Sequence, residues 1–191
     1  DMATMADNAP SCSNYINAVK WHVANQKFDA AIFKAGANNQ IVQKYNPAKY
    51  PTAKVQNAAV NGELWTGSGT TTKKTFPELS EISYENSKNI TSSDNCPPEN
   101  ITSCVMKVSY GNFDFFAGGD LQYNGRSSHA WKDAELPCAK AVGQVELLKA
   151  NHHGVTNTNQ VDALKALNPQ TIVINSWVDC HPRTDILNSM E

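Results

Sequence analysis

The stretch SCVMKVSYGNFDFFAGGD, residues 103–120, carries the clearest structural pattern in this chain. Every second residue from Cys104 to Tyr110 is apolar, which is the period of a half-buried β-strand. Gly111-Asn112 interrupts the pattern, and a second apolar segment then leads into Gly118-Gly119-Asp120. A tight Gly-Asn turn between two such segments predicts a β-hairpin.

Downstream of the hairpin, helix and strand patterns alternate. VELLK at 145–149 is a short apolar run typical of a buried strand, and the β-branched residues of TIVINSW at 171–177 predict another. Between them, apolar residues at helical spacing over 156–167 predict a helix that ends at the following proline. A helical or irregular stretch is expected over 129–141, and a turn with a short helix over 179–190. The order strand, helix, strand predicts an α/β layered fold.

Upstream of the hairpin the patterns are weaker. Apolar residues at helical spacing predict a helix over 13–26, and the apolar run at 29–34 is interpreted as a strand or a helix end. Residues 38–75 contain prolines and a Thr/Gly/Ser tract and indicate no clear element. Residues 85–100 are expected to form a polar loop.

The composition sets bounds on the class of protein. The 191 residues suffice for about one domain, and 16 basic against 18 acidic residues leave a net charge of −2. A nucleic-acid or membrane-surface binder would show a basic excess, and here no basic cluster exceeds the pair Lys73-Lys74. No apolar run approaches the roughly 20 residues of a membrane-spanning helix. We therefore expect no nucleic-acid partner and no membrane segment.

The five cysteines show no zinc-binding spacing, so a structural zinc site is disfavoured. Cys96 and Cys104 flank a Pro-Pro segment and would close a small loop by a disulfide in an oxidising compartment, a pairing that the sequence leaves open. Two glycosylation sequons begin at Asn89 and Asn100, and chance occurrence in an Asn-rich chain is the simpler explanation for them.

Polar clusters follow the three strands expected in the second half of the chain. They are Gly118-Gly119-Asp120, Asn151-His152-His153-Gly154 and Asp179-Cys180-His181-Pro182. In α/β folds ligands bind at the carboxyl ends of the strands, and glycines there allow close backbone approach to a small bound object. A carboxylate and imidazoles on separate strand ends are suitable ligands for zinc or a similar divalent ion.

The order and spacing of these motifs over about 100–190 resemble the C-terminal half of the metallo-β-lactamase fold. The resemblance is closest to the branch of the ComEC-like competence proteins and related secreted hydrolases. It implies a four-layer αββα sandwich of which this chain holds the C-terminal portion. Residues 1–191 would then be one partial domain, with a middle region and loop over 1–100 and the C-terminal half, which carries the site motifs, over 101–191.

The resemblance also implies roles for four residues. Asp120 matches the carboxylate that bridges two metal ions, and His152 matches the final metal ligand. His153 is expected as a second ligand or as a substrate-facing catalytic group, and His181 as a histidine near the site that holds a phosphate or donates a proton. The implied cofactor is a pair of Zn²⁺ ions, with Mn²⁺ as the alternative. Such ions lower the pKa of a bound water to about 7, so that hydroxide can attack a phosphoryl or carbonyl centre.

The main metal-binding signature of that family, His-x-His-x-Asp-His, is absent from this chain. One explanation is that Asp1 begins a fragment, and that an upstream segment or a partner chain supplies the missing ligands and completes the fold. The expected function is then a metal-dependent hydrolase acting on a phosphoester or another small molecule, secreted or periplasmic rather than cytoplasmic, with this chain alone inactive. The alternative is a non-catalytic binding or structural domain on a degenerate scaffold. Half of a two-sheet sandwich would also expose apolar sheet surface.

Several other residues are weaker candidates. Trp65 and Trp177 are substrate-stacking or packing aromatics, and Arg183 is a partner for an anionic substrate or an ordinary surface arginine. Cys180 is a candidate reactive thiol. The remaining histidines, His22 and His129, are expected to lie on the surface or to pack.

Overall fold

The computed structural model describes residues 10–76, 99–123, 130–176 and 178–191. The chain divides into two compact units, Asp1–Ile32 and Phe33–Glu191. In the first unit, helix α2 (Pro10–Asn25) confirms the helix predicted over 13–26 and begins slightly earlier. The apolar run at 29–34 forms neither a strand nor the end of a helix, because α2 already ends at Asn25 and the run has no regular structure.

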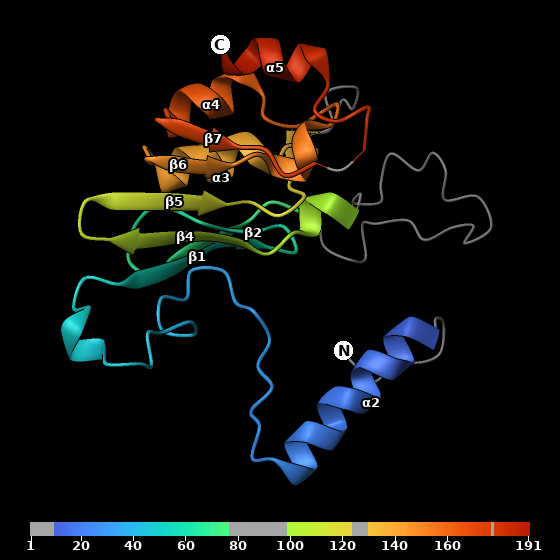
Figure 1. Cartoon of the computed structure of the whole chain (residues 1–191), viewed down its shortest axis with the longest axis vertical. Coiled ribbons are helices and arrows are strands. Elements are labelled where there is room, and N and C mark those ends of the chain that lie inside the picture. The colour runs from blue at the N-terminus through green and yellow to red at the C-terminus, as the bar shows by residue number, and fades with distance from the viewer. Residues whose placement is uncertain (1–9, 77–98, 124–129, 177) are drawn as a thin grey trace. The chain divides into compact units, whose positions relative to one another are not determined.

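The second unit is built on a seven-stranded mixed sheet formed by the described residues (Figure 1). The order across the sheet is β3-β2-β1-β4-β5-β6-β7. Neighbours from β3 to β5 are antiparallel, whereas β5, β6 and β7 run parallel. The strands are β1 (Lys54–Val60), β2 (Glu63–Trp65), β3 (Thr72–Lys74), β4 (Val105–Tyr110), β5 (Phe113–Ala117), β6 (Leu147–Lys149) and β7 (Thr171–Val173).

The predicted hairpin is confirmed as β4 and β5. Tyr110 pairs with Phe113, and Gly111 in the turn between them has φ 60°, a left-handed conformation that glycine adopts readily. The predicted strands at 145–149 and 171–177 are also confirmed, as the shorter β6 and β7. The expectation that the second of them is buried is wrong, because β7 is the last strand of the sheet and its Thr171 and Val173 are exposed. The α/β class follows from this sheet and the helices packed on it.

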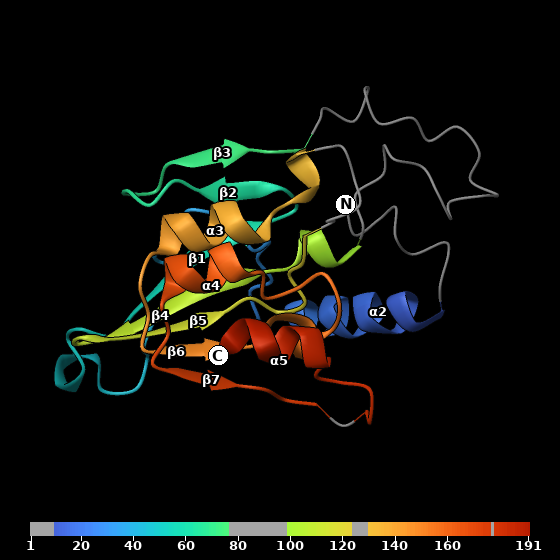
Figure 2. The same ribbon diagram turned by 90° about the horizontal axis from the view of Figure 1, so that it is seen from above.

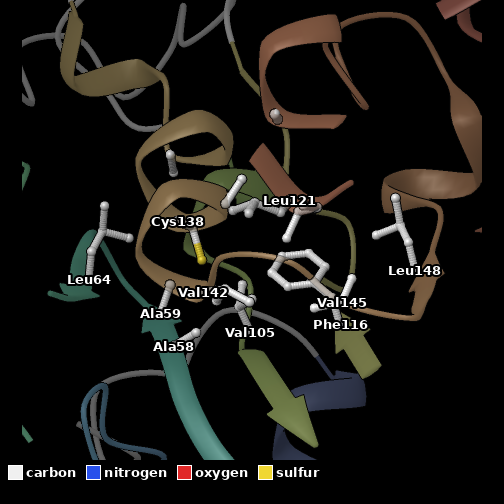
Figure 3. Close-up of a cluster of buried hydrophobic side chains, with 14 of the residues drawn as sticks. Ala58, Ala59, Leu64, Val105, Phe116, Leu121, Cys138, Val142, Val145 and Leu148 are labelled. Carbon is white, nitrogen blue, oxygen red and sulfur yellow. The ribbon is translucent and has the colours of Figure 1, made fainter. Parts of the chain in front are cut away.

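Helices cover one face of the sheet (Figure 2). They are α3 (Glu135–Val142), α4 (Val161–Leu167) and α5 (Thr184–Met190). The described residues also form the 3-10 turns η1 (Pro47–Lys49), η2 (Glu99–Thr102), η3 (Ala130–Lys132) and η4 (Asn151–Gly154). The core lies between this face and α3, where Phe116, Val105 and Cys138 are fully buried (Figure 3). Each such side chain contributes about 1.5–3 kcal/mol by leaving water.

The helix predicted over 156–167 begins later than expected, at Val161. Neither Thr156 nor Thr158 caps it. The hydroxyl of Thr158 instead donates to the carbonyl of Val155 at 2.6 Å, and the side chain belongs to the loop before the helix. This loop connects η4 to α4, and its hydrogen bonds become important at the candidate site.

The opposite face of the sheet is apolar and only partly buried. Strand side chains alternate between faces, so Val108, Phe115 and Leu147, which pair across β4, β5 and β6, lie opposite the buried Phe116. Near this row, Tyr110 is 52% exposed and Phe113 is 46% exposed. An apolar row thus lies on the face opposite the helices.

Three strands lie where the sequence indicated no clear element. β2 and β3 span three residues each, too short to show a period, and the buried part of β1 contains the small residues Ala58 and Ala59. No helix among the described residues has the length and apolar character needed to cross a membrane.

Candidate functional site

The polar clusters predicted at the strand ends meet at one edge of the sheet. Asp120 follows β5, the turn η4 follows β6, and His181 follows β7. Because β5, β6 and β7 are parallel, their carboxyl ends share this edge. The structure therefore brings Asp120, His152, His153 and His181 into one neighbourhood.

Asp120 and His153 form the closest pair of this cluster. The Oδ1 of Asp120 lies 3.9 Å from the Nε2 of His153, and the two side chains are 43% and 33% exposed. The Nδ1 of His153 lies 2.6 Å from the carbonyl oxygen of Asn175. Since a carbonyl only accepts, Nδ1 is the donor, and the neutral ring then carries its lone pair on Nε2.

With a neutral His153 ring, the Nε2 lone pair and the Asp120 carboxylate face each other. Two ligands of a tetrahedral Zn²⁺, each bound at about 2.1 Å, stand roughly 3.4 Å apart, so the pair needs to close only slightly to share an ion. The carbonyl of Asn175 plays the part that outer partners of metal-bound histidines commonly play, because it orients the ring and selects the tautomer.

His152 lies beside this pair but is oriented differently. Its Nδ1 is 3.1 Å from the amide nitrogen of Asn100, which also donates to Gln122 Oε1 at 3.1 Å. An amide nitrogen donates, so the Nδ1 of His152 accepts and the neutral ring carries its proton on Nε2. Burial lowers the pKa of His152, with smaller effects from neighbouring charges. In this conformation His153, rather than His152, presents a lone pair toward Asp120.

His181 stacks on His153. The two ring centroids are 6.4 Å apart and the planes are nearly parallel, at 2°. The segment is held by the backbone, since the N–H of Arg183 donates to the carbonyl of Gly154 at 3.0 Å. His181 therefore flanks the pair on the side of the loop that follows β7.

Lys149, the last residue of β6, was not singled out from the sequence. Its ammonium donates to the carbonyl of Gly119 at 2.7 Å and lies 4.0 Å from the Oδ1 of Asp120. Burial lowers the pKa of Lys149, and the nearby carboxylate of Asp120 opposes that effect. Its position at the carboxyl end of a predicted strand was the signal that could have identified it.

A buried carboxylate lies beneath the histidine turn and was also missed. Glu135, at the start of α3, is 1% exposed and accepts from the side-chain amide of Asn151 at 2.8 Å. It also accepts from the backbone N–H groups of Asn159 and Gln160, at 2.6 and 2.9 Å. Burial raises the pKa of Glu135 to about 7, although these three hydrogen bonds favour the charged form.

The loops of the site approach each other at glycines. A Cβ on Gly118 would lie 2.0 Å from the Oδ1 of Asn151, and a Cβ on Gly154 would lie 2.8 Å from Pro182. The glycines therefore make room for neighbouring loops of the protein rather than for a bound object. His152 and His153 have φ 45° and 59°, and such left-handed backbone costs about 1–2 kcal/mol per non-glycine residue.

The weaker candidates lie apart from this cluster or outside the described residues. His129, Trp177 and Cys96 belong to the residues that are not described, and Cys104, the expected partner of Cys96, is a free thiol in the structure. Trp65 lines a groove of about 580 Å³ together with Trp131 and Lys140, and its indole donates to the carbonyl of Gly69 at 3.0 Å.

The remaining candidates are exposed. The guanidinium of Arg183 lies 3.9 Å from the carboxylate of Asp185, with both side chains more than half exposed. Cys180 and Cys104 are exposed free thiols. His22 lies on the surface of α2, where it contacts Trp21 edge-on and bonds Gln26 at 2.8 Å, as expected for a surface or packing histidine.

In the part of the chain that the structure describes, no group of three or more His, Cys, Asp or Glu side chains is placed to hold a metal ion. A scan against known protein families finds none that matches the chain, and no curated protein matches it.

Proposed function

We propose that this chain contributes to a metal-dependent hydrolase of the metallo-β-lactamase superfamily, acting on a phosphoester. The observation that carries the proposal is the facing pair at the sheet edge, Asp120 Oδ1 and His153 Nε2, at 3.9 Å. Both atoms are lone-pair donors, and the hydrogen bond from His153 to Asn175 sets the tautomer that a ligand needs. The pair is also open to solvent, as a substrate site must be.

The partly buried sheet face supports the four-layer αββα architecture as a further part of this proposal. Helices α3 and α4 cover one face, and the row Val108, Phe115 and Leu147 lies on the other. In a sandwich such a face packs against a second sheet at about 10 Å. A second sheet, from a segment outside the described residues or from a partner chain, would give the face a core.

The same segment or partner chain would complete the metal site. Asp120 and His153 supply two ligands, and the described residues hold no third His, Cys, Asp or Glu in a suitable place. A structural or catalytic zinc site takes three or four protein ligands. We therefore expect the chain alone to bind a divalent ion weakly and to be inactive.

In the hydrolase, this chain's residues would hold and orient the reacting groups. Asp120 and His153 would hold Zn²⁺ or Mn²⁺, which lowers the pKa of a bound water to near neutrality. His181, stacked on His153, stands where its imidazole can donate to a phosphoryl oxygen or hold a proton. Lys149 adds a positive charge beside Asp120, which favours an anionic substrate at this edge.

Metal binding tests the proposal directly. We expect the 191-residue chain to take up Zn²⁺ in isothermal titration, and Asp120→Ala and His153→Ala each to weaken that binding at least tenfold. His22→Ala is the matched control, because His22 is an exposed helix histidine with no part in the cluster. If Asp120→Ala binds Zn²⁺ as tightly as the unchanged chain, the proposed site is wrong.

A second candidate is a non-catalytic module that binds an anion at the same edge. The observation in its favour is Lys149, whose ammonium lies 4.0 Å from Asp120 and supplies a cation from the protein itself. Inorganic phosphate distinguishes the two. The hydrolase requires added Zn²⁺ for tight phosphate binding, whereas the module binds phosphate in the presence of a chelator and loses it in Lys149→Ala.

A further inference from the structure

The segment 151–160, which carries His152 and His153, is held at both ends by hydrogen bonds to one buried carboxylate, that of Glu135. At the first end, the side-chain amide of Asn151 donates to Glu135 Oε1 at 2.8 Å. At the second end, the backbone N–H groups of Asn159 and Gln160 donate to the same carboxylate, at 2.6 and 2.9 Å. The segment between them contains both histidines.

The side chain of Asn159 adds two hydrogen bonds to the backbone of Asn151. Its side-chain oxygen accepts from the backbone N–H of Asn151 at 2.9 Å, and its side-chain nitrogen donates to the carbonyl of Asn151 at 3.0 Å. Asn151, the residue directly before His152, is therefore held through its backbone by Asn159 and through its side chain by Glu135. Both holding residues are almost fully buried, so water does not compete for these bonds.

The same network reaches the loop that carries Asp120. The Oδ1 of Asn151 packs against Gly118, so closely that any Cβ there would overlap it at 2.0 Å. The backbone N–H of His152 donates to the carbonyl of Gly119 at 3.2 Å. Asn151, the first residue of η4, thus packs the turn that carries both histidines against the Asp120 loop.

We propose that Glu135 is the positioning residue of this site, whose carboxylate holds the turn that presents His152 and His153 beside Asp120. A role of Glu135 in catalysis depends on the proposed function, whereas its role in holding the turn does not. His152 and His153 both adopt positive φ, a conformation that a free turn of L-residues rarely keeps. Three hydrogen bonds to one buried carboxylate hold them there. Partners that hydrogen-bond a metal ligand directly change metal affinity by about 10–100-fold when they are removed, and Glu135 acts on the same histidines through Asn151, so we take this range as the expected scale.

The experiment compares Glu135→Ala, Glu135→Gln and Asn159→Ala in the 191-residue chain. Asn159→Ala is included because it removes the two bonds to the Asn151 backbone and leaves the buried charge hydrogen-bonded. Leu167→Ala is the matched control, since Leu167 at the end of α4 is only 2% exposed and has no hydrogen bond to the turn. It loses stability without touching the network.

The first readout is the long-range ¹H–¹⁵N spectrum of the imidazoles in the metal-free chain, which reports the tautomers of His152 and His153. The second is Zn²⁺ affinity by chelator competition. We expect Glu135→Ala and Asn159→Ala to shift the His153 signals and to weaken Zn²⁺ binding about 10–100-fold. Glu135→Gln, which keeps an accepting oxygen, should rescue part of both, and Leu167→Ala should change neither.

The inference is overturned if Glu135→Ala and Asn159→Ala give the same spectra and Zn²⁺ affinity as Leu167→Ala, because Glu135 would then serve stability alone. Failure of the proposed function looks different. In that case the unchanged chain binds no Zn²⁺ while the imidazole signals still move in Glu135→Ala and Asn159→Ala, which supports the positioning role. Should Glu135→Ala not fold, Asn159→Ala and Glu135→Gln decide between these outcomes.

Discussion

The buried carboxylate of Glu135 makes the stability of this protein depend on pH in a direction opposite to that of a salt-bridged acid. Burial raises its pKa from the ordinary value of 4.5 to about 7. The folded state therefore binds this proton more tightly than the unfolded state does. The contribution of the group to stability is complete below pH 4.5 and is lost as the pH rises through 7.

The size of the effect follows from the shift. Each pKa unit corresponds to about 1.4 kcal/mol, so the free energy of unfolding should fall by about 3 kcal/mol between pH 4.5 and 8 because of Glu135 alone. Glu135→Gln removes the titration. Over that range, the free energy of unfolding of the unchanged chain should therefore fall by about 3 kcal/mol relative to that of Glu135→Gln.

Urea unfolding, followed by far-UV circular dichroism at half-unit steps from pH 4.5 to 8, measures this difference. Asp162→Asn is the matched control, because it makes the same carboxylate-to-amide change at an exposed position in the first turn of α4. A flat difference for Glu135→Gln would refute the reasoning, since the pKa of Glu135 would then be the same in the folded and unfolded states.

Three further predictions concern packing and the histidines. Gly118→Ala places a Cβ 2.0 Å from Asn151 Oδ1 and should lower the free energy of unfolding by about 1–3 kcal/mol in urea; an unchanged free energy of unfolding would contradict the close packing. Phe116→Ala, at a fully buried position, should cost about 3–5 kcal/mol and the half-exposed Phe113→Ala clearly less, and a reversed order in the same assay would mean that the faces of β5 are misassigned. Asn100→Asp replaces the donor to His152 Nδ1 by a carboxylate and should raise the pKa of His152 in an NMR titration, with His22 as the internal control; an unchanged His152 would show that the bond from Asn100 is not made.

The part of the fold with a regular period could be predicted from the sequence. The alternation in 103–117 defined a hairpin, and β-branched residues marked β7. Strands β2 and β3 escaped because three residues cannot establish a period. Their structure depends on pairing between strands, of β2 with β1 and of β3 with β2, which the pattern within one short segment does not predict.

The site was predictable to the extent that it follows from strand ends. Asp120, His152 and His153 were expected together because parallel strands finish at one edge, but His152 was the expected ligand and the structure turns His153 toward Asp120 instead. The assignment of tautomers was not, because it depends on Asn100 and Asn175, which are distant in sequence from the histidines that they contact. Glu135 was missed for a further reason: charged residues are rarely buried, so a glutamate at the start of a helix suggests only a favourable surface charge.

The half-covered sheet has a consequence for how this protein behaves at different concentrations. The row Val108, Phe115 and Leu147 gains from any apolar surface that removes it from water, whereas the face under α3 is already dry. Whatever binds the folded sheet and not the unfolded chain shifts the folding equilibrium by mass action. The melting temperature of this chain should then rise with the concentration of whatever binds this face.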